Sequence, residues 1–154
     1  MTDITIGQKA PAFTVALNAE KKVKLSDYKG KKLILYFYPK DDTPGCTSQA
    51  IGFSAVQKDL DARGVRILGV SADTIEKHAK FSAKHNLSID LGSDPDMLML
   101  NDYGVWVEKN MYGRKYMGIE RSTFLIDEKG KVAKIWRKVK IKTHIDDIMS
   151  ELDG

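Results

Sequence analysis

The chain has 154 residues and a mass of 17.3 kDa, a size that predicts one domain spanning residues 1–154. With 42% hydrophobic residues, 30% charged residues and a net charge of +4, its composition is that of a mildly basic globular protein with a buried core. The single cysteine excludes a disulfide scaffold and any zinc site built from several cysteines of this chain.

Residues 1–11 contain no apolar stretch of the kind that a secretory signal requires. We therefore expect the protein in the cytoplasm, where a lone thiol stays reduced. The longest run of large apolar residues, Leu33 to Tyr38, is far short of the ~18 residues that cross a bilayer, so we expect no membrane partner.

Residues 13–25 predict a β-hairpin, because two stretches with alternating apolar residues flank a polar turn. Residues 33–38 and 65–71 are apolar on both faces, which is typical of central strands that are covered on both sides. Residues 43–62 between them carry apolar side chains at helical spacing. The sequence therefore predicts a right-handed βαβ unit in the first half of the chain.

Two further helices are predicted after this unit. Asp73 is expected to cap the first of them, with Glu76 completing a capping box, and this helix should run to about Asn86. Asp94 and Pro95 predict the start of a third, short helix, because proline suits the first helical position.

Residues 122–127 and 132–139 predict two strands joined by a tight turn at 128–130, and residues 141–152 predict a closing helix. Basic side chains gather in and around the second strand with no acid between them: Lys131, Lys134, Arg137, Lys138, Lys140 and Lys142. They could contact phosphates, but we interpret them as the solvated face of an edge strand, whose lysines discourage strand pairing. Because no nucleic-acid motif accompanies them, we expect no nucleic-acid partner.

The order of these elements places the chain in the α/β class, with a mixed central sheet flanked by helices and an N-terminal β-hairpin. This order favours a thioredoxin-like fold over a doubly wound nucleotide-binding fold. The sequence contains neither a Walker loop nor a dinucleotide fingerprint, which agrees with that choice.

The lone cysteine follows the predicted central strand and lies at the start of the predicted helix 43–62. Thr43 suits the helix N-cap and Pro44 the first helical position, which puts Cys46 in the first turn. There, free backbone N–H groups and the positive end of the helix dipole favour a thiolate. A buried structural cysteine is the alternative. The position directly after Thr43 and Pro44 favours a reactive nucleophile.

Other kinds of cysteine chemistry find little support in the sequence. A dithiol oxidoreductase needs Cys-x-x-Cys, and Thr43 occupies the first of these positions. A cysteine protease or acyltransferase needs a histidine base, and His78, His85 and His144 stand in no recognisable motif, although the fold could still bring one of them close. His78 and His85 lie ~10 Å apart along one predicted helix, too far to share a metal ion without other ligands, so we expect no metal site. We interpret both side chains as solvated.

The pattern Pro39-x-x-x-Thr43-x-x-Cys46 resembles the active-site motif of peroxiredoxins. The chain is similar to the bacterioferritin comigratory protein, or Q-type, subfamily over nearly its whole length, beginning at Ile6. The segments that carry this likeness are 36–40, 43–47, 103–106, 118–121 and 123–127.

The resemblance implies a thiol-dependent peroxidase that reduces hydrogen peroxide and organic hydroperoxides without a cofactor. It implies that Cys46 is the peroxidatic cysteine, oxidised from thiolate to sulfenic acid, and that Thr43 orients peroxide and thiolate. It implies that Pro39 shields the pocket and that Arg121 holds the thiolate and the peroxide oxygens. The backbone at Gly45 is expected to help bind the substrate through N–H groups of the helix start. The alternative for Arg121 is a salt bridge to a neighbouring acid, Glu120 or Asp127.

Recycling of the sulfenic acid is expected to need an outside thiol. Many relatives carry a second, resolving cysteine, and the two usual positions are occupied here by Ile51 and Ser82. The reductant is expected to be thioredoxin, glutaredoxin or glutathione, acting on a protein that is a monomer or weak dimer. Ser82 is either an ordinary helix serine or a replacement for a resolving cysteine.

Two other functions are compatible with the sequence. The same thiol could make the protein a peroxide sensor or redox chaperone, in which case oxidation would saturate after one event. Alternatively, the chain could be a basic binding module with a catalytically idle fold, whose nucleic-acid retention would survive the change Cys46→Ala.

Overall fold

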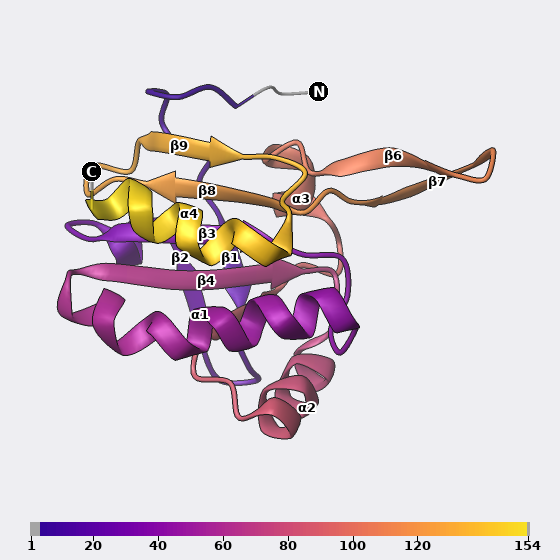
Figure 1. The fold of residues 1–154 in the computed structure, drawn as a ribbon, viewed down its shortest axis with the longest axis horizontal. Helices are drawn as coiled ribbons and strands as arrows, with labels where there is room; N and C mark the ends of the chain where they lie inside the picture. Colours follow the sequence, from indigo (N-terminus) through magenta and orange to yellow (C-terminus); the bar gives the residue numbers. More distant parts are fainter. Residues whose placement is uncertain (1–3, 154) are drawn as a thin grey trace.

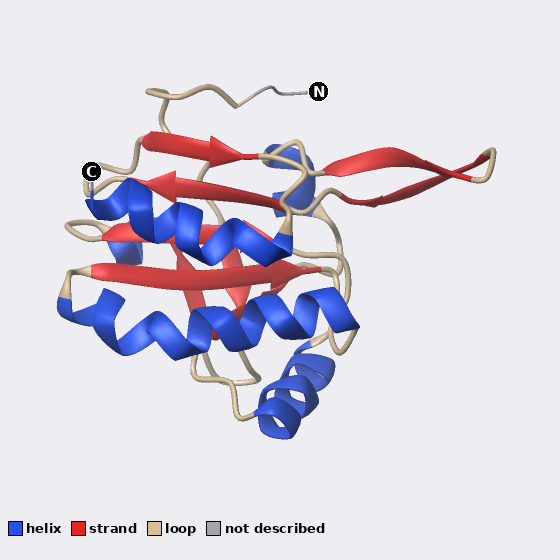
Figure 2. Cartoon of the chain, in the orientation of Figure 1, coloured by secondary structure: helices blue, strands red, loops and turns tan. Residues whose placement is uncertain are grey.

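The computed structural model describes residues 4–153, whose strands form a large sheet and a separate hairpin, with helices packed against the sheet (Figures 1 and 2). The elements are β1 (Thr14–Ala16), β2 (Lys22–Lys24), η1 (Leu25–Tyr28), β3 (Lys32–Phe37), α1 (Pro44–Ala62), β4 (Val65–Ser71), α2 (Ile75–His85), β5 (Asp90–Ser93), α3 (Leu98–Asp102), β6 (Trp106–Met111), β7 (Arg114–Ile119), β8 (Ser122–Ile126), β9 (Val132–Trp136) and α4 (Ile141–Asp153). The seven strands of the large sheet follow the order β2-β1-β5-β4-β3-β8-β9. The chain therefore has the predicted α/β architecture.

The strand β3 lies near the middle of this sheet. It pairs in parallel with β4, where Ile34 lies opposite Ile67, and antiparallel with β8, where Phe37 lies opposite Ser122. Its side chains point alternately into two separate apolar clusters, with Leu35 in one and Ile34 in the other. The prediction of a central strand covered on both faces is confirmed.

The helices α1 and α4 lie on the same face of the sheet, where Phe53 of α1 and Ile148 of α4 belong to one apolar cluster (Figure 1). The short helix α3 lies behind the sheet in this view, and its Leu100 belongs to the cluster on the opposite face. The helix α2 contacts β5. Because α1 directly follows β3, its first turn lies beyond the carboxyl end of the central strand.

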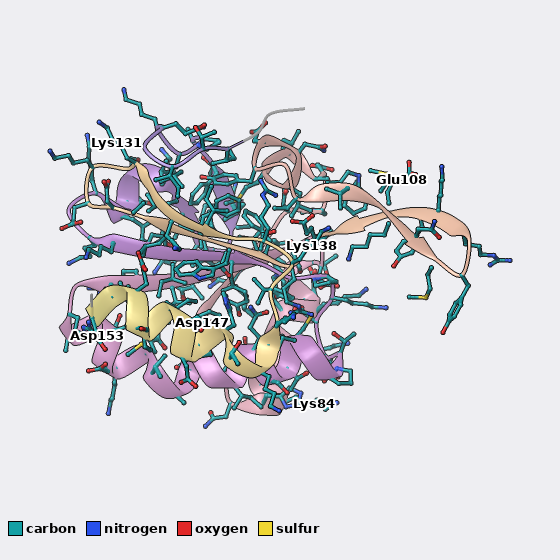
Figure 3. The ribbon with its side chains drawn as sticks, turned by 45° about the horizontal axis from the view of Figure 1, so that its top comes forward. Lys84, Glu108, Lys131, Lys138, Asp147 and Asp153 are labelled. Carbon is teal, nitrogen blue, oxygen red and sulfur yellow. The ribbon has the colours of Figure 1, made fainter. Side chains whose placement is uncertain are left out.

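The predicted hairpin near the N-terminus is confirmed as the antiparallel pair β1 and β2. The strands β8 and β9 also pair as predicted, although β9 ends at Trp136 rather than at Val139. As expected from its lysines, β9 is an edge strand, and Figure 3 shows Lys131 and Lys138 toward its two ends. Among residues 4–153, no helix is both long and apolar enough to cross a membrane.

The predicted starts of two helices are wrong. The N-cap of α2 is Thr74, whose hydroxyl accepts the Lys77 N–H, because the Asp73 carboxylate is already engaged with Ser71. The helix α3 begins at Leu98 rather than at Pro95. The residues before it form a turn, in which the Asp94 carboxylate accepts the Leu100 N–H at 2.8 Å.

Three strands have no counterpart in the sequence prediction. One is β5, which pairs in parallel with β4 and has four residues. The other two, β6 and β7, form a two-stranded hairpin that projects from the body of the molecule (Figure 1), and Figure 3 shows Glu108 on it. The turn of this hairpin carries Tyr112, whose side chain is fully exposed.

The interpretation of the helix histidines as solvated is wrong for His78, which is 2% exposed. His144 of α4 is also buried, and its Nε2 lies 2.7 Å from the Thr123 hydroxyl. The rings of Phe53 and Trp136 contact the His144 ring edge to face. Burial in these apolar surroundings lowers the pKa of His144 to about 4.

The low pKa of His144 predicts a loss of stability in mild acid. The unfolded chain takes up a proton on this histidine as the pH falls below its ordinary value of 6.5, whereas the folded protein does so only near 4. The contribution of neutral His144 to stability is therefore complete above pH 6.5 and falls between there and pH 4. We expect the melting temperature of the wild type to fall more between about pH 7 and pH 5 than that of His144→Gln, measured by circular dichroism. Parallel curves for the two proteins would contradict this assignment.

Candidate active site

The loop of residues 38–43 leads from the carboxyl end of β3 into α1, and Cys46 is the third residue of that helix. Its side chain belongs to the apolar cluster beneath α1, and only 2% of the residue is exposed. The helix begins at Pro44 as predicted. The sulfur is therefore held at a helix N-terminus but is nearly closed off from water.

Thr43 occupies the N-cap position, but its side chain does not cap the helix. Its hydroxyl instead donates to the carbonyl oxygen of Lys40 at 2.9 Å. The hydroxyl therefore leaves the N–H groups at Gly45 and Cys46 free of side-chain capping. Such N–H groups at a helix start bind an oxygen that carries negative charge.

Arg121 lies between β7 and β8 and reaches the start of α1 from the beginning of β8, the strand that pairs with β3. Its Nη2 donates to Cys46 Sγ at 3.2 Å, and its Nη1 donates to Oε1 of Gln49 at 2.6 Å. The alternative of a salt bridge to a neighbouring acid does not hold. Glu120 pairs with Arg137 at 3.5 Å, and the Asp127 carboxylate accepts backbone N–H groups of its own turn.

Gln49 is a site residue that the sequence did not reveal. It lies one turn after Cys46 on α1 and is 1% exposed. Its side-chain oxygen fixes the guanidinium of Arg121 through the 2.6 Å hydrogen bond. A glutamine within a helix carries no pattern that would mark it, because the signal is a contact with a residue far along the chain.

The floor of the site is aromatic and has a low polarity. The ring of Tyr36 stacks on Phe53 at 4.6 Å between centroids. Burial, together with the negative charges of Cys46 and Asp41, raises the pKa of Tyr36 above its ordinary value, so its phenol stays neutral. Charge interactions are stronger in such surroundings than in water, which increases the effect of Arg121 on a thiolate at Cys46.

The other predicted positions are also located. Pro39 is exposed at the start of the loop, and Gly45 lies directly beneath the guanidinium of Arg121. Ile51 is 47% exposed on α1, and Ser82 is half-buried on α2. Within the part of the chain that the structure describes, no group of three candidate ligands could hold a metal ion.

None of the histidines bonds to the sulfur. His78 faces Asp41 and the Gly92 carbonyl group, and His144 faces Thr123. The hydrogen-bond partner of Cys46 is a permanent cation instead. The arrangement therefore suits a cysteine nucleophile that attacks a small electrophile, with N–H donors nearby for an oxygen that leaves with negative charge.

Comparison with known proteins shows which family the chain resembles over nearly its whole length. The model of the AhpC/TSA family matches residues 6–135. A putative peroxiredoxin bcp of Coxiella burnetii is 50% identical over 97% of this chain and 99% of that protein, and peroxiredoxin Bcp of Bacillus subtilis is 48% identical over 97% and 95%. A structure from a study of alkyl peroxide reduction by Xanthomonas campestris bacterioferritin comigratory protein has a TM-score of 0.89. That protein is 39% identical over 97% of this chain and 98% of its own.

The geometry at Gly45 generates a test of the Arg121 contact. A Cβ atom at this position would lie 3.3 Å from Arg121 Nη2 and 2.8 Å from Cδ1 of Ile141. The end of Ile141 can rotate away, but the guanidinium can move only by breaking or stretching its hydrogen bonds to Cys46 and Gln49. We expect Gly45→Ala to fold and to push Arg121 away from the sulfur. The rate of Cys46 alkylation by iodoacetamide should then fall about threefold to tenfold at neutral pH.

Gly52→Ala is the matched control for this variant. Gly52 lies on the same helix, and its added Cβ would meet only Ile145 of α4, at 3.1 Å, with no contact to Arg121. Its alkylation rate should equal that of the wild type. Mass spectrometry of the native proteins follows the alkylation over time. Equal alkylation rates for the two alanine variants would argue against the role assigned to the Arg121 contact.

Proposed function

The chain belongs to the AhpC/TSA family and to its Bcp group of peroxiredoxins, and on this basis we propose that Cys46, Thr43 and Arg121 carry out its peroxidase reaction. The protein is a thiol peroxidase that reduces hydroperoxides and is regenerated by a thiol reductant. The observation that carries the assignment of residues is the 3.2 Å contact between Arg121 Nη2 and Cys46 Sγ at the start of α1.

In the first step, the Cys46 thiolate attacks one oxygen of the hydroperoxide in line with the O–O bond. An S–O bond forms, the O–O bond breaks, and the other oxygen leaves as an alkoxide or hydroxide that takes up a proton. Cys46 becomes a sulfenic acid. Arg121 and the N–H groups at Gly45 and Cys46 stabilise the charge on the leaving oxygen, and the Thr43 hydroxyl orients the peroxide.

In the second step, a thiol from outside the chain attacks the sulfur of the sulfenic acid. Water leaves and a mixed disulfide forms, which a second thiol then reduces to restore Cys46. An outside thiol is needed because Cys46 is the single cysteine of the sequence. Thioredoxin, glutaredoxin and glutathione are the candidates for this reductant.

We also propose that the chain works as a single cytoplasmic domain and as a monomer or weak dimer. One seven-stranded sheet connects the first strand to β9, which supports a single domain. Pro39 is proposed to shield the mouth of the site, because it is exposed at the start of the catalytic loop.

The direct test of this function is the variant Cys46→Ser. An alkoxide is not available at neutral pH, so we expect the variant to keep the fold and lose peroxide turnover by at least about a thousandfold. The measurement is steady-state consumption of hydrogen peroxide with each candidate reductant in turn. Circular dichroism establishes that the variant is folded, and full turnover in the folded variant would refute the proposal.

The absence of a second sulfur generates a further prediction. Without reductant, excess peroxide should convert Cys46 of the wild type to the sulfinic acid, because no internal disulfide can form. We expect Ser82→Cys to form an intramolecular disulfide after the same treatment. Because a disulfide needs Cα atoms within about 7 Å and the two positions lie on different helices, we expect the first turn of α1 to unwind as the bond forms.

Mass spectrometry separates the two products of this experiment, a loss of two hydrogens for the disulfide and a gain of two oxygens for the sulfinic acid. Ile51→Cys tests the other usual position of a resolving cysteine in the same experiment, because Ile51 is exposed on α1 itself. Sulfinic acid alone in oxidised Ser82→Cys would show that position 82 cannot supply a resolving thiol.

A further inference from the structure

A buried polar network lies beneath the catalytic loop. At its centre is Asp41, five residues before Cys46 and 8% exposed. Its carboxylate accepts the Tyr38 hydroxyl at 2.5 Å and lies 2.6 Å from Nδ1 of His78. Its backbone N–H donates to the carboxylate of Asp73 at 2.8 Å. A charge as buried as this one persists only where partners replace the lost water.

His78 joins the catalytic loop to the sheet through both of its ring nitrogens. Nδ1 lies 2.6 Å from the carboxylate of Asp41 and 3.4 Å from the Tyr38 hydroxyl, and Nε2 lies 3.0 Å from the carbonyl oxygen of Gly92 in β5. Because the carbonyl oxygen can only accept, Nε2 donates to it, and one proton is then shared between Nδ1 and the carboxylate. His78 and Asp41 therefore form a buried hydrogen-bonded pair between α2 and the catalytic loop.

The second acid of the network ties the loop to the sheet. The Asp73 carboxylate, which holds the N–H of Asp41, also accepts the Ser71 hydroxyl at 2.8 Å. The Ser93 hydroxyl donates to the Asp73 carbonyl oxygen at 2.5 Å. Since Ser71 and Ser93 are the last residues of β4 and β5, the loop is fixed to the carboxyl ends of two parallel strands.

The loop needs such support because its conformation is unfavourable. Asp42 has a φ of 60°, in the left-handed region that residues other than glycine rarely adopt. Its carboxylate contacts Lys84 at 2.8 Å and His85 at 2.9 Å (Lys84 is labelled in Figure 3). The helix α2 therefore binds the loop twice, through an exposed pair at Asp42 and a buried pair at Asp41. Exposed pairs contribute little, so the buried pair is the stronger restraint.

We propose that His78 is a positioning residue for the peroxidase reaction, an inference that rests on the role proposed for Cys46. As the buried hydrogen-bond partner of Asp41, it holds the loop before α1 and thereby the first turn in the geometry that reacts with peroxide. His78 itself does not touch the peroxide. Removing one member of a buried polar pair leaves the other without its partner, so the loop would leave this position.

The test compares His78→Gln and Asp41→Asn with His85→Gln. The last is a matched control, because His85 also links α2 to the catalytic loop but through the exposed pair. We expect the first two variants to lower kcat/KM for hydrogen peroxide at least about tenfold, and the control to stay within about twofold of the wild type. The double variant should lose no more than either single one, because both changes break the same pair.

A second readout separates positioning from stability alone. Reduction of the sulfenic acid by a small dithiol, measured in single turnover, needs access to the sulfur rather than the closed geometry. It should therefore not be slowed in His78→Gln or Asp41→Asn. Variants that melt at lower temperature but keep the wild-type kcat/KM well below their melting point would overturn the inference.

Failure of this inference is distinguishable from failure of the proposed function. Full activity of His78→Gln beside an inactive Cys46→Ser would refute the role of His78 and keep that of Cys46. A wild type without peroxide turnover would refute the function. Should the variants not fold, NMR of the wild type still tests the buried pair: we expect a ring N–H proton of His78 to exchange slowly with water, and rapid exchange would overturn the proposal.

Discussion

The hydrogen bond from Arg121 to the Cys46 sulfur joins two segments that are 75 residues apart, and the geometry of the site depends on it. The register of the sheet makes this contact possible. Antiparallel pairing places Phe37, at the end of β3, opposite Ser122, at the start of β8. Arg121 precedes that strand, and the loop to α1 follows the other, so both functional groups arrive at the same edge. A shift of this register would separate the cation from the sulfur and also exchange the side chains of β8 between the two buried faces of the sheet.

Polar and charged groups lie on two sides of the start of α1. Arg121, Gln49 and Cys46 form one set, and Asp41 and His78 form the other. Neither set is a strong source of stability, because the cost of removing such groups from water offsets most of their attraction. What such sets provide is a single arrangement of the chain, since each group tolerates only the position in which its partner compensates it. The buried Tyr36 interacts with a member of each set, because Cys46 and Asp41 both raise its pKa and so keep its phenol neutral.

Local patterns predicted much of this structure, and contacts between distant segments account for what was missed. The central strand, α1 and the place of Cys46 follow from the run of apolar residues and from Thr43 and Pro44, all within one stretch of chain. The strand β5 was missed because four residues with a glycine carry no clear period, and the β6–β7 hairpin because most of its side chains face water. His78 was wrongly expected to be solvated, because helical spacing does not show that Asp41, from a separate loop, contacts it. Gln49 gave no signal for the same reason.

The near-complete burial of Cys46 limits how fast the protein can work. A hydroperoxide needs only a narrow passage to reach Cys46, which is 2% exposed, whereas a thiol carried by another protein would need the first turn of α1 to move aside. With a reductant of that size, one sulfur would have to meet two reactants that it cannot receive in the same conformation. Each turnover would then include an excursion to an open form and a return. The frequency of that excursion would set a ceiling on the number of peroxide molecules that the protein removes per second, however abundant the oxidant becomes.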